Sequence, residues 1–310
     1  MPAFESGQLI DGVHWWELAG HHDPAAFVDA WRQAHFACQA VAEAGKSWAD
    51  QQDDDSHSSL VWVPDRSKLP DQYFAGTLLS GDSDARALLR PWDLKLFIVD
   101  AAGSPLDLTD AQGRSVEDLK AWVRATCEQH VGTPKQDASP APDLPDHPLG
   151  QGASFAEPNQ LAMAEVIRFY ANADAVLQRL AELLRADGSL AIDDPKVWPH
   201  HFDLAMLVTI EADSDGDMTK TIGVGLTPPD SLSTTGYWYI SPWSRDGHDD
   251  ATDLEDLSVG TWHSRDGALP MAVLSVDDVT STEDPAEQHR RVASFVSEAY
   301  TVLERSLRSA

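Results

Sequence analysis

The sequence predicts an α+β fold made of two similar halves, each consisting of a helix, an antiparallel sheet and a second helix. Three observations support this expectation. Long segments with apolar residues at helical spacing enclose runs of short strands. The strands follow one another through short connections, which can join only antiparallel strands. A proline-rich segment separates two stretches with the same order of elements, so we also predict an internal duplication.

The first half begins with a helix from about Pro24 to Ala44. Asp23 is a suitable N-cap, and proline is favoured at the first helical position. A second helix is expected to begin at Ser115, whose hydroxyl can form a capping box with Asp118. Between the helices, short apolar runs are separated by Pro, Gly and Asp turns, and they predict four strands. These strands are 59–63, 73–79, 85–89 and 94–99.

The second half repeats this order after the segment 132–153, which contains five prolines and predicts a linker. The predicted domains are therefore 1–131 and 154–310. A long helix is expected over 158–186, and a last helix after Asp284 and Pro285. The predicted strands between these two helices are 202–210, 221–226, 237–241 and 271–275.

The composition limits the partners of the chain. Of 310 residues, 42% are hydrophobic, as in ordinary globular proteins, and 51 acidic against 22 basic residues give a net charge of −29. Repulsion at this charge disfavours nucleic acids and anionic membranes, and leaves small molecules as candidate partners. We find neither a signal peptide nor a transmembrane segment, and expect a cytoplasmic protein. The acidic surface suggests a salt-adapted source. The oligomeric state is not indicated.

The most specific polar motif is Trp198-Pro199-His200-His201-Phe202-Asp203 at the start of a predicted strand. Because side chains alternate along a strand, His201 and Asp203 are expected on one face. Asp55 and His57 form a similar pair before the first strand of the first half. If the halves pack about a pseudo-twofold axis, the two pairs meet. The predicted catalytic residues are then His57, His201 and Asp203, in a site between the halves.

Two chemistries suit these side chains. Imidazoles and carboxylates are ligands for a divalent metal such as zinc, iron or manganese, for which His57, His201, Asp203 and Asp55 are the candidate ligands. Without a metal, a His/Asp pair can act as general acid and base. The alternative is that these residues have no function in chemistry: His201 and Asp203 form a hydrogen bond with each other, and Asp55 and His57 lie in a solvated loop. The cofactor stays undetermined.

Aromatic residues offer a different function, which is non-catalytic binding of a small molecule. Aromatic rings can stack on a ligand, and their polar atoms can form hydrogen bonds with it. The residues expected to contact the ligand are Trp198, His200, Trp238, Tyr239 and His263. On a strand, Trp238 and Tyr239 point to opposite faces, so one of them is expected in the core. A third hypothesis is a structural or interaction protein. The segment with Gly223 and Gly225 continues as strand, so these glycines predict a bulge or a close backbone approach, not a nucleotide loop.

Several short runs resemble a family of uncharacterised bacterial proteins, a domain of unknown function. The most distinctive is Trp198-Pro199-His200-His201-Phe202-Asp203. The other runs that carry the resemblance are 45–48, 54–58, 221–226 and 236–239, with Pro242 and Trp243. This chain has Thr227-Pro228-Pro229-Asp230 where the family pattern implies Ser-Pro-Gly-Asp, so that loop is expected to differ. The resemblance supports the position of the predicted site and implies no activity.

Overall fold

The structure is a computed structural model, and it confirms the α+β class with helices and a large antiparallel sheet. It describes residues 4–13, 16–20, 23–64, 71–137, 142–188, 191–247, 254–265 and 268–309. The chain divides into two compact units. Unit 1 comprises Met1–Gly20, Tyr170–Pro195 and Leu204–Ala310, and unit 2 comprises His21–Phe169 and Lys196–Asp203.

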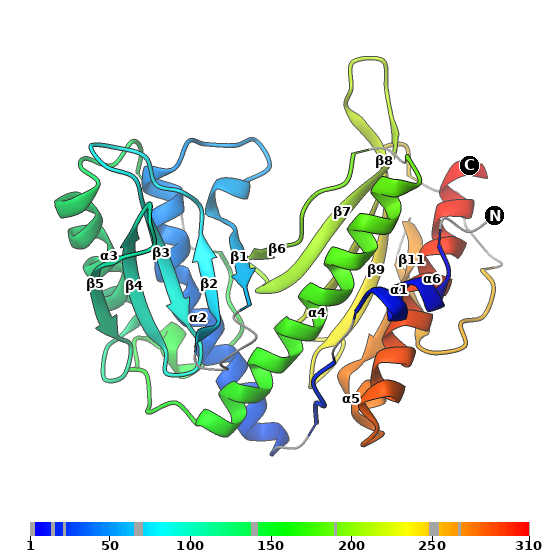
Figure 1. The fold of residues 1–310 in the computed structure, drawn as a ribbon, viewed down its shortest axis with the longest axis horizontal. Coiled ribbons are helices and arrows are strands. Elements are labelled where there is room, and N and C mark those ends of the chain that lie inside the picture. The colour runs from blue at the N-terminus through cyan, green and yellow to red at the C-terminus, as the bar shows by residue number, and fades with distance from the viewer. Residues whose placement is uncertain are drawn as a thin grey trace. The chain divides into compact units, whose positions relative to one another are not determined.

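Unit 2 contains an antiparallel sheet in the order β6-β1-β2-β3-β4-β5 (Figure 1). The strands β1 to β5 follow each other as a meander. Strand β6, which is the last of the six in the sequence, pairs with β1. The strands are β1 (Leu60–Val63), β2 (Tyr73–Gly76), β3 (Ala85–Arg90), β4 (Lys95–Asp100), β5 (Pro105–Asp110) and β6 (Lys196–Trp198). The helices of this unit are α2 (Pro24–Trp48), η1 (Ser56–Ser58), α3 (Val116–His130), η3 (Pro148–Gln151) and the start of α4 (Gln160–Ala186).

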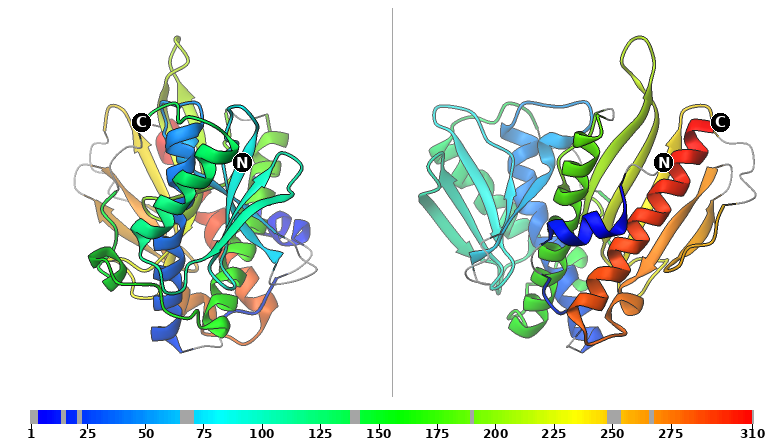
Figure 2. Two further views of the ribbon diagram at one scale, coloured as in Figure 1. Left: turned by 90° about the vertical axis from the view of Figure 1, so that its left-hand side faces the viewer. Right: turned by 45° about the vertical axis from the view of Figure 1, so that its right-hand side comes forward.

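The core of unit 2 lies between the sheet and the two helices α2 and α3, which cover one sheet face (Figures 1 and 2). The helix starts agree with the predictions: Asp23 caps α2 through Ala25 N–H, and Ser115 forms a capping box with Asp118 at α3. Trp31 and Trp48 of α2 are fully buried. Strand β5 was missed by the sequence analysis because nearly all its residues are exposed and it lacks apolar alternation.

Helix α2 continues through Gly45 to Trp48, so the predicted end at Ala44 is wrong. Gly45 does not end the helix but allows η1 to approach α2 closely. A Cβ at this position would overlap the carbonyl of His57 in η1 and lie 3.0 Å from Thr77 Oγ1. Only glycine therefore lets η1 pack directly against the last turns of α2.

Unit 1 contains five antiparallel strands, in the order β10-β11-β9-β8-β7. Its strands are β7 (Asp203–Ala212), β8 (Met218–Thr227), β9 (Tyr237–Ser244), β10 (Thr261–Arg265) and β11 (Ala268–Ser275). Its helices are α1 (Ser6–Gly12), the end of α4, α5 (Val276–Thr280) and α6 (Pro285–Ser309). Helices α1 and α6 lie on the same side of the strands (Figures 1 and 2).

Strand alternation separates a core face from an opposite face in unit 1. Alternate residues of β7 are fully buried apolar side chains, and so are those paired with them on β8 and β9. These residues are Leu204, Met206, Val208, Ile210, Ile222, Val224, Leu226, Trp238 and Ile240. The opposite face of the same strands carries mainly small and polar residues, with Tyr237, Tyr239 and the exposed Trp243 as its aromatic members.

The borders of the units differ from the predicted domains. The segment 132–153 lies inside unit 2, while α4 begins in unit 2 and ends in unit 1. The described part of this proline-rich segment makes contacts with the rest of unit 2. Leu149 is buried, and His147 Nε2 donates to Asp29 Oδ1 of α2 at 3.1 Å. The duplication stays a prediction, although both units combine helices with an antiparallel meander.

None of the helices within the described ranges combines the length and apolar character needed to cross a membrane.

Candidate functional site

The Trp-Pro-His-His-Phe motif forms a tight turn in unit 2. The N–H groups of His201 and Phe202 both donate to the carbonyl of Trp198, at 3.2 and 2.6 Å. Strand β7 begins only at Asp203, so the prediction of a strand through His201 is wrong. The turn follows β6, which pairs with β1 through Val197 and Leu60. This pairing fixes the base of the turn.

Two buried side chains of α2 form hydrogen bonds with the backbone of the turn. His35 Nε2 lies 2.9 Å from the carbonyl oxygen of Pro199, and Gln39 Nε2 donates to the same oxygen at 2.7 Å. A carbonyl can only accept, so the His35 proton is on Nε2. The pKa of His35 is lowered to about 4, mainly by burial and to a smaller extent by the nearby His201 and His200, while the hydrogen bond to Pro199 opposes this shift. His35 is therefore a neutral donor at pH 7.

Phe202 closes the turn in an unusual backbone conformation. Its φ is +57°, in the left-handed region that bulky residues rarely adopt. The side chain is fully buried, stacked on His35 with ring centroids 5.2 Å apart and packed on Phe74 at 5.0 Å. This packing compensates for the strain of about 1–2 kcal/mol in the left-handed conformation. The buried side chain of Phe202 therefore stabilises a single conformation of the turn.

The anchored turn presents His200 and His201 outward. Both residues are exposed, and their ring centroids are 4.4 Å apart. His201 therefore does not face a cavity, which corrects the expectation that it would do so together with Asp203. Asp203 is buried, as the first residue of β7. The turn, in place of a strand, explains why His201 and Asp203 do not share one face.

The other predicted pair lies on the loop after α2, also in unit 2. His57 is buried in η1, where its Nδ1 accepts the Gln52 N–H at 3.2 Å and its carbonyl accepts the Thr77 hydroxyl at 2.6 Å. Asp55 precedes η1 with a φ of +59° and is exposed. His57 therefore anchors the loop, and Asp55 is displayed on it.

Electrostatics connect this loop with the turn. The pKa of His200 is below its usual value, first because its ring is partly covered and second because His201 is adjacent. The carboxylate of Asp55 opposes this shift and raises the pKa of His200, whereas Lys46 lowers it. Lys46 is half-buried near the end of α2, and burial lowers its own pKa. The two segments singled out from the sequence thus lie near each other, with His200 as the histidine that interacts with Asp55.

The surroundings of the turn add an aromatic ring and a second lysine. Trp198 is half-exposed, and its ring meets that of His200 edge-on at 6.2 Å. Lys196 Nζ lies 5.7 Å from the centre of the Trp198 ring. Burial raises the pKa of Asp54, but hydrogen bonds from Ser56 and, to a smaller extent, the charge of Lys196 make it lower than usual overall. In a chain of net charge −29, two of the seven lysines therefore lie beside the histidine pair.

The structure does not support the predicted metal site. Among the residues it describes, no three His, Cys, Asp or Glu side chains gather as a metal-binding group. The predicted ligands His57, His201, Asp203 and Asp55 fail for a geometric reason. His201 points outward from a turn, Asp203 is buried at the start of β7, and His57 Nδ1 already accepts a backbone N–H.

The remaining aromatic candidates belong to unit 1. Trp238 is buried in the core, as the alternation allowed, and cannot contact a ligand from the surface. Tyr239 is half-buried on the opposite face, where a Cβ on Gly225 would lie 2.9 Å from the Tyr239 hydroxyl. The same Cβ would lie 2.8 Å from both Ala205 Cβ and the Leu204 carbonyl oxygen of β7, so the backbone of a neighbouring strand approaches Gly225 closely, as predicted. His263 is half-exposed on β10, paired with Met271.

Sequence reasoning missed His35, Gln39, Lys46 and Lys196. A signal was present for the first two, because both polar residues fall on the buried side of α2, four positions apart. Buried polar side chains usually have hydrogen-bond partners, so they indicated a segment held against the helix. Lys196 is only four residues before His200, but nothing in the spacing of Lys46 connected it with a residue 154 positions away.

Comparison of the chain with family models, with curated proteins and with solved structures finds no match.

Proposed function

We propose that the protein is an enzyme that acts on a small molecule at the turn Trp198–Phe202, with His200 as its general base. The observation that carries this proposal is the construction of the turn. Two buried donors, His35 and Gln39, converge on the carbonyl of Pro199, and a left-handed Phe202 fixes the far end. Strained backbone held by its surroundings is concentrated at functional sites.

The protonation state of His200 suits this role. A pKa below the usual value leaves the imidazole neutral at pH 7, so it can accept a proton from a substrate. The resulting imidazolium would be stabilised by Asp55, whose charge already raises the pKa of His200. Trp198 offers an aromatic surface, and Lys46 and Lys196 offer positive charge to an anionic substrate group. Small carboxylic or phosphorylated compounds are therefore the favoured substrates.

Proton abstraction can be tested without knowing the product. We would incubate the protein in D2O with a panel of small keto and hydroxy acids and sugar phosphates, and follow loss of C–H signals by proton NMR. The proposal expects exchange in at least one compound, with at least about a hundredfold loss in His200→Asn, within the usual range for removing a general base. The matched control is His263→Asn, a histidine of unit 1, which should keep the activity.

The alternative that we retain is a binding protein that uses the same turn without catalysis. It predicts saturable binding of a panel compound that is weakened in His200→Asn, with no exchange or turnover in the wild type. Binding that is equal in wild type and His200→Asn would reject the turn as the functional site under either interpretation.

A further inference from the structure

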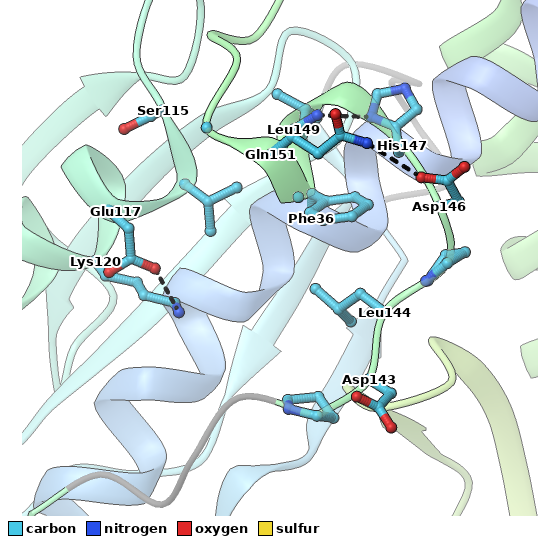
Figure 3. Close-up of a pocket in the computed structure, with 15 residues that line it drawn as sticks. Phe36, Ser115, Glu117, Lys120, Asp143, Leu144, Asp146, His147, Leu149 and Gln151 are labelled. Carbon is cyan, nitrogen blue, oxygen red and sulfur yellow. Dashed lines mark hydrogen bonds and ion pairs between the residues drawn. The ribbon is translucent and has the colours of Figure 1, made fainter.

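A second feature of unit 2 is a cavity of about 430 Å³ between the start of α3, the segment 142–152 and α2 (Figure 3). Its volume is within the range of small-molecule sites, which hold a ligand in a largely apolar cavity with a few polar groups. None of the residues of the histidine turn lines it. It is therefore a separate candidate site.

The floor of the cavity is apolar. Phe36 comes from α2, Val116 from the first turn of α3, and Leu149 from η3, and all three are buried. Leu144 and Pro145 of the opposite wall are only half-exposed. In Figure 3, Phe36 lies at the back and Leu144 projects between the two walls. These side chains form a surface that would cover a hydrocarbon or aromatic body and remove it from water.

The rim of the cavity is predominantly acidic. Glu117, Asp143 and Asp146 are exposed carboxylates on its lining, and they face one lysine, Lys120. The ammonium of Lys120 is already 3.0 Å from Glu117 Oε1, which neutralises that pair. The carboxylates of Asp143 and Asp146 therefore dominate the rest of the rim. A ligand with a positive group would be attracted, and an anion would be repelled.

The walls are held before any ligand binds. His147 Nε2 donates to Asp29, while its Nδ1 accepts the Leu149 N–H at 3.3 Å. The ring of His147 also packs on Phe36, with centroids 5.5 Å apart. Because three prolines restrict the backbone of the same segment, little freedom would be lost on binding. Preorganisation of this kind favours a binding site over a packing defect.

We propose that this cavity binds an organic ammonium compound, with the apolar body on Phe36, Val116 and Leu144 and the charged group beside Asp143. The proposal is independent of the function assigned to the histidine turn. The acidic charge of the whole chain attracts cations in general, so the test must separate this cavity from the overall field. The apolar floor makes that separation possible.

The probes are benzylammonium, benzyl alcohol and benzoate, titrated calorimetrically and by saturation-transfer NMR at about 0.15 M salt, where long-range attraction is largely screened. We expect saturable binding of benzylammonium, at least about tenfold tighter than that of benzyl alcohol, and none of benzoate. Amide shifts should be confined to residues lining the cavity, such as Val116, Lys120 and Gly150.

Two variants locate the charged contact. Asp143→Asn should weaken benzylammonium at least threefold and leave benzyl alcohol unchanged. The matched control is Asp84→Asn, an exposed aspartate outside the cavity lining, which should change neither. Leu144→Ser should weaken both probes. Unchanged amide shifts outside the cavity show that each variant is folded.

Three results would overturn the proposal. One is the absence of saturable benzylammonium binding. Another is equal binding of ammonium and alcohol, which removes the role of charge. The third is equal weakening by Asp143→Asn and Asp84→Asn, which assigns the attraction to the overall field.

Discussion

His35 and His200 belong to the same unit and both have a lowered pKa, yet His200 is part of the turn Trp198–Phe202, whereas His35 of α2 supports that turn. His35 is buried, stacked on Phe202, and its Nε2 is committed to Pro199. His200 is exposed, and its neighbours are His201, Asp55 and Lys46, all of which bear on its charge. The same residue type therefore serves as a structural donor in one place and as a titratable surface group in the other. The contacts of each histidine decide its role, because the pKa shifts of the two have the same direction.

The largest effect is expected from Phe202→Ala, which should destabilise the protein by about 3–5 kcal/mol because a fully buried ring is lost. Phe202→Gly removes the same ring but relieves the left-handed strain, so it should be about 1 kcal/mol more stable than Phe202→Ala. Urea unfolding of the two variants measures both differences. Equal stability of the two would mean that the turn stores no strain, and would weaken the proposed site.

Acid should unfold the protein partly through His35. Its folded pKa of about 4 is below the ordinary value of 6.5, so the unfolded state binds a proton more readily. The stability from this group is complete above about pH 6.5 and is lost as the pH falls towards 4, by up to about 3 kcal/mol. Denaturant unfolding between pH 7 and 4 should show this slope, and His35→Gln should reduce it. An unchanged slope in that variant would assign the acid sensitivity to other groups.

A smaller effect is expected at His200, where Asp55→Asn should lower its pKa further because the Asp55 charge raises it. Proton NMR of the histidine ring signals at several pH values measures this shift. Asp84→Asn, a distant exposed aspartate, serves as the control. Stability should change by less than about 0.5 kcal/mol in both variants, as at most exposed positions. A rise in the pKa of His200 would contradict its proposed pairing with Asp55.

The smallest effect concerns salt. The net charge of −29 favours protonation of exposed histidines, and this field is screened over about 10 Å at 0.1 M salt and about 3 Å at 1 M. Between these concentrations the pKa of His200 should fall by a few tenths of a unit. The buried ring of His35, bonded to Pro199, should respond less. If both histidines shift equally in an NMR titration, exposure does not distinguish them.

Much of the fold could be predicted because it depends on local patterns. Capping by Asp23 and Ser115, the apolar stripe of α2 and the alternation of β8 and β9 are short-range signals, and the structure contains each of them. The position of the candidate site was also indicated, since the motif at 198–203 and the loop at 54–58 lie in one unit. Strand periodicity failed at His201, because a left-handed Phe202 forms a turn that alternation cannot reveal.

By itself, the sequence determined the fold class, the helix starts, the acidic surface and the residue types available for chemistry, because each follows from spacing or composition. Tertiary structure decided which of these residues meet. It buried Trp238 and His57, left His201 exposed, and brought Lys46 of α2 and Asp55 near His200. The reason is that burial and charge interactions depend on contacts between segments far apart in the chain. No periodicity within a single segment encodes those contacts.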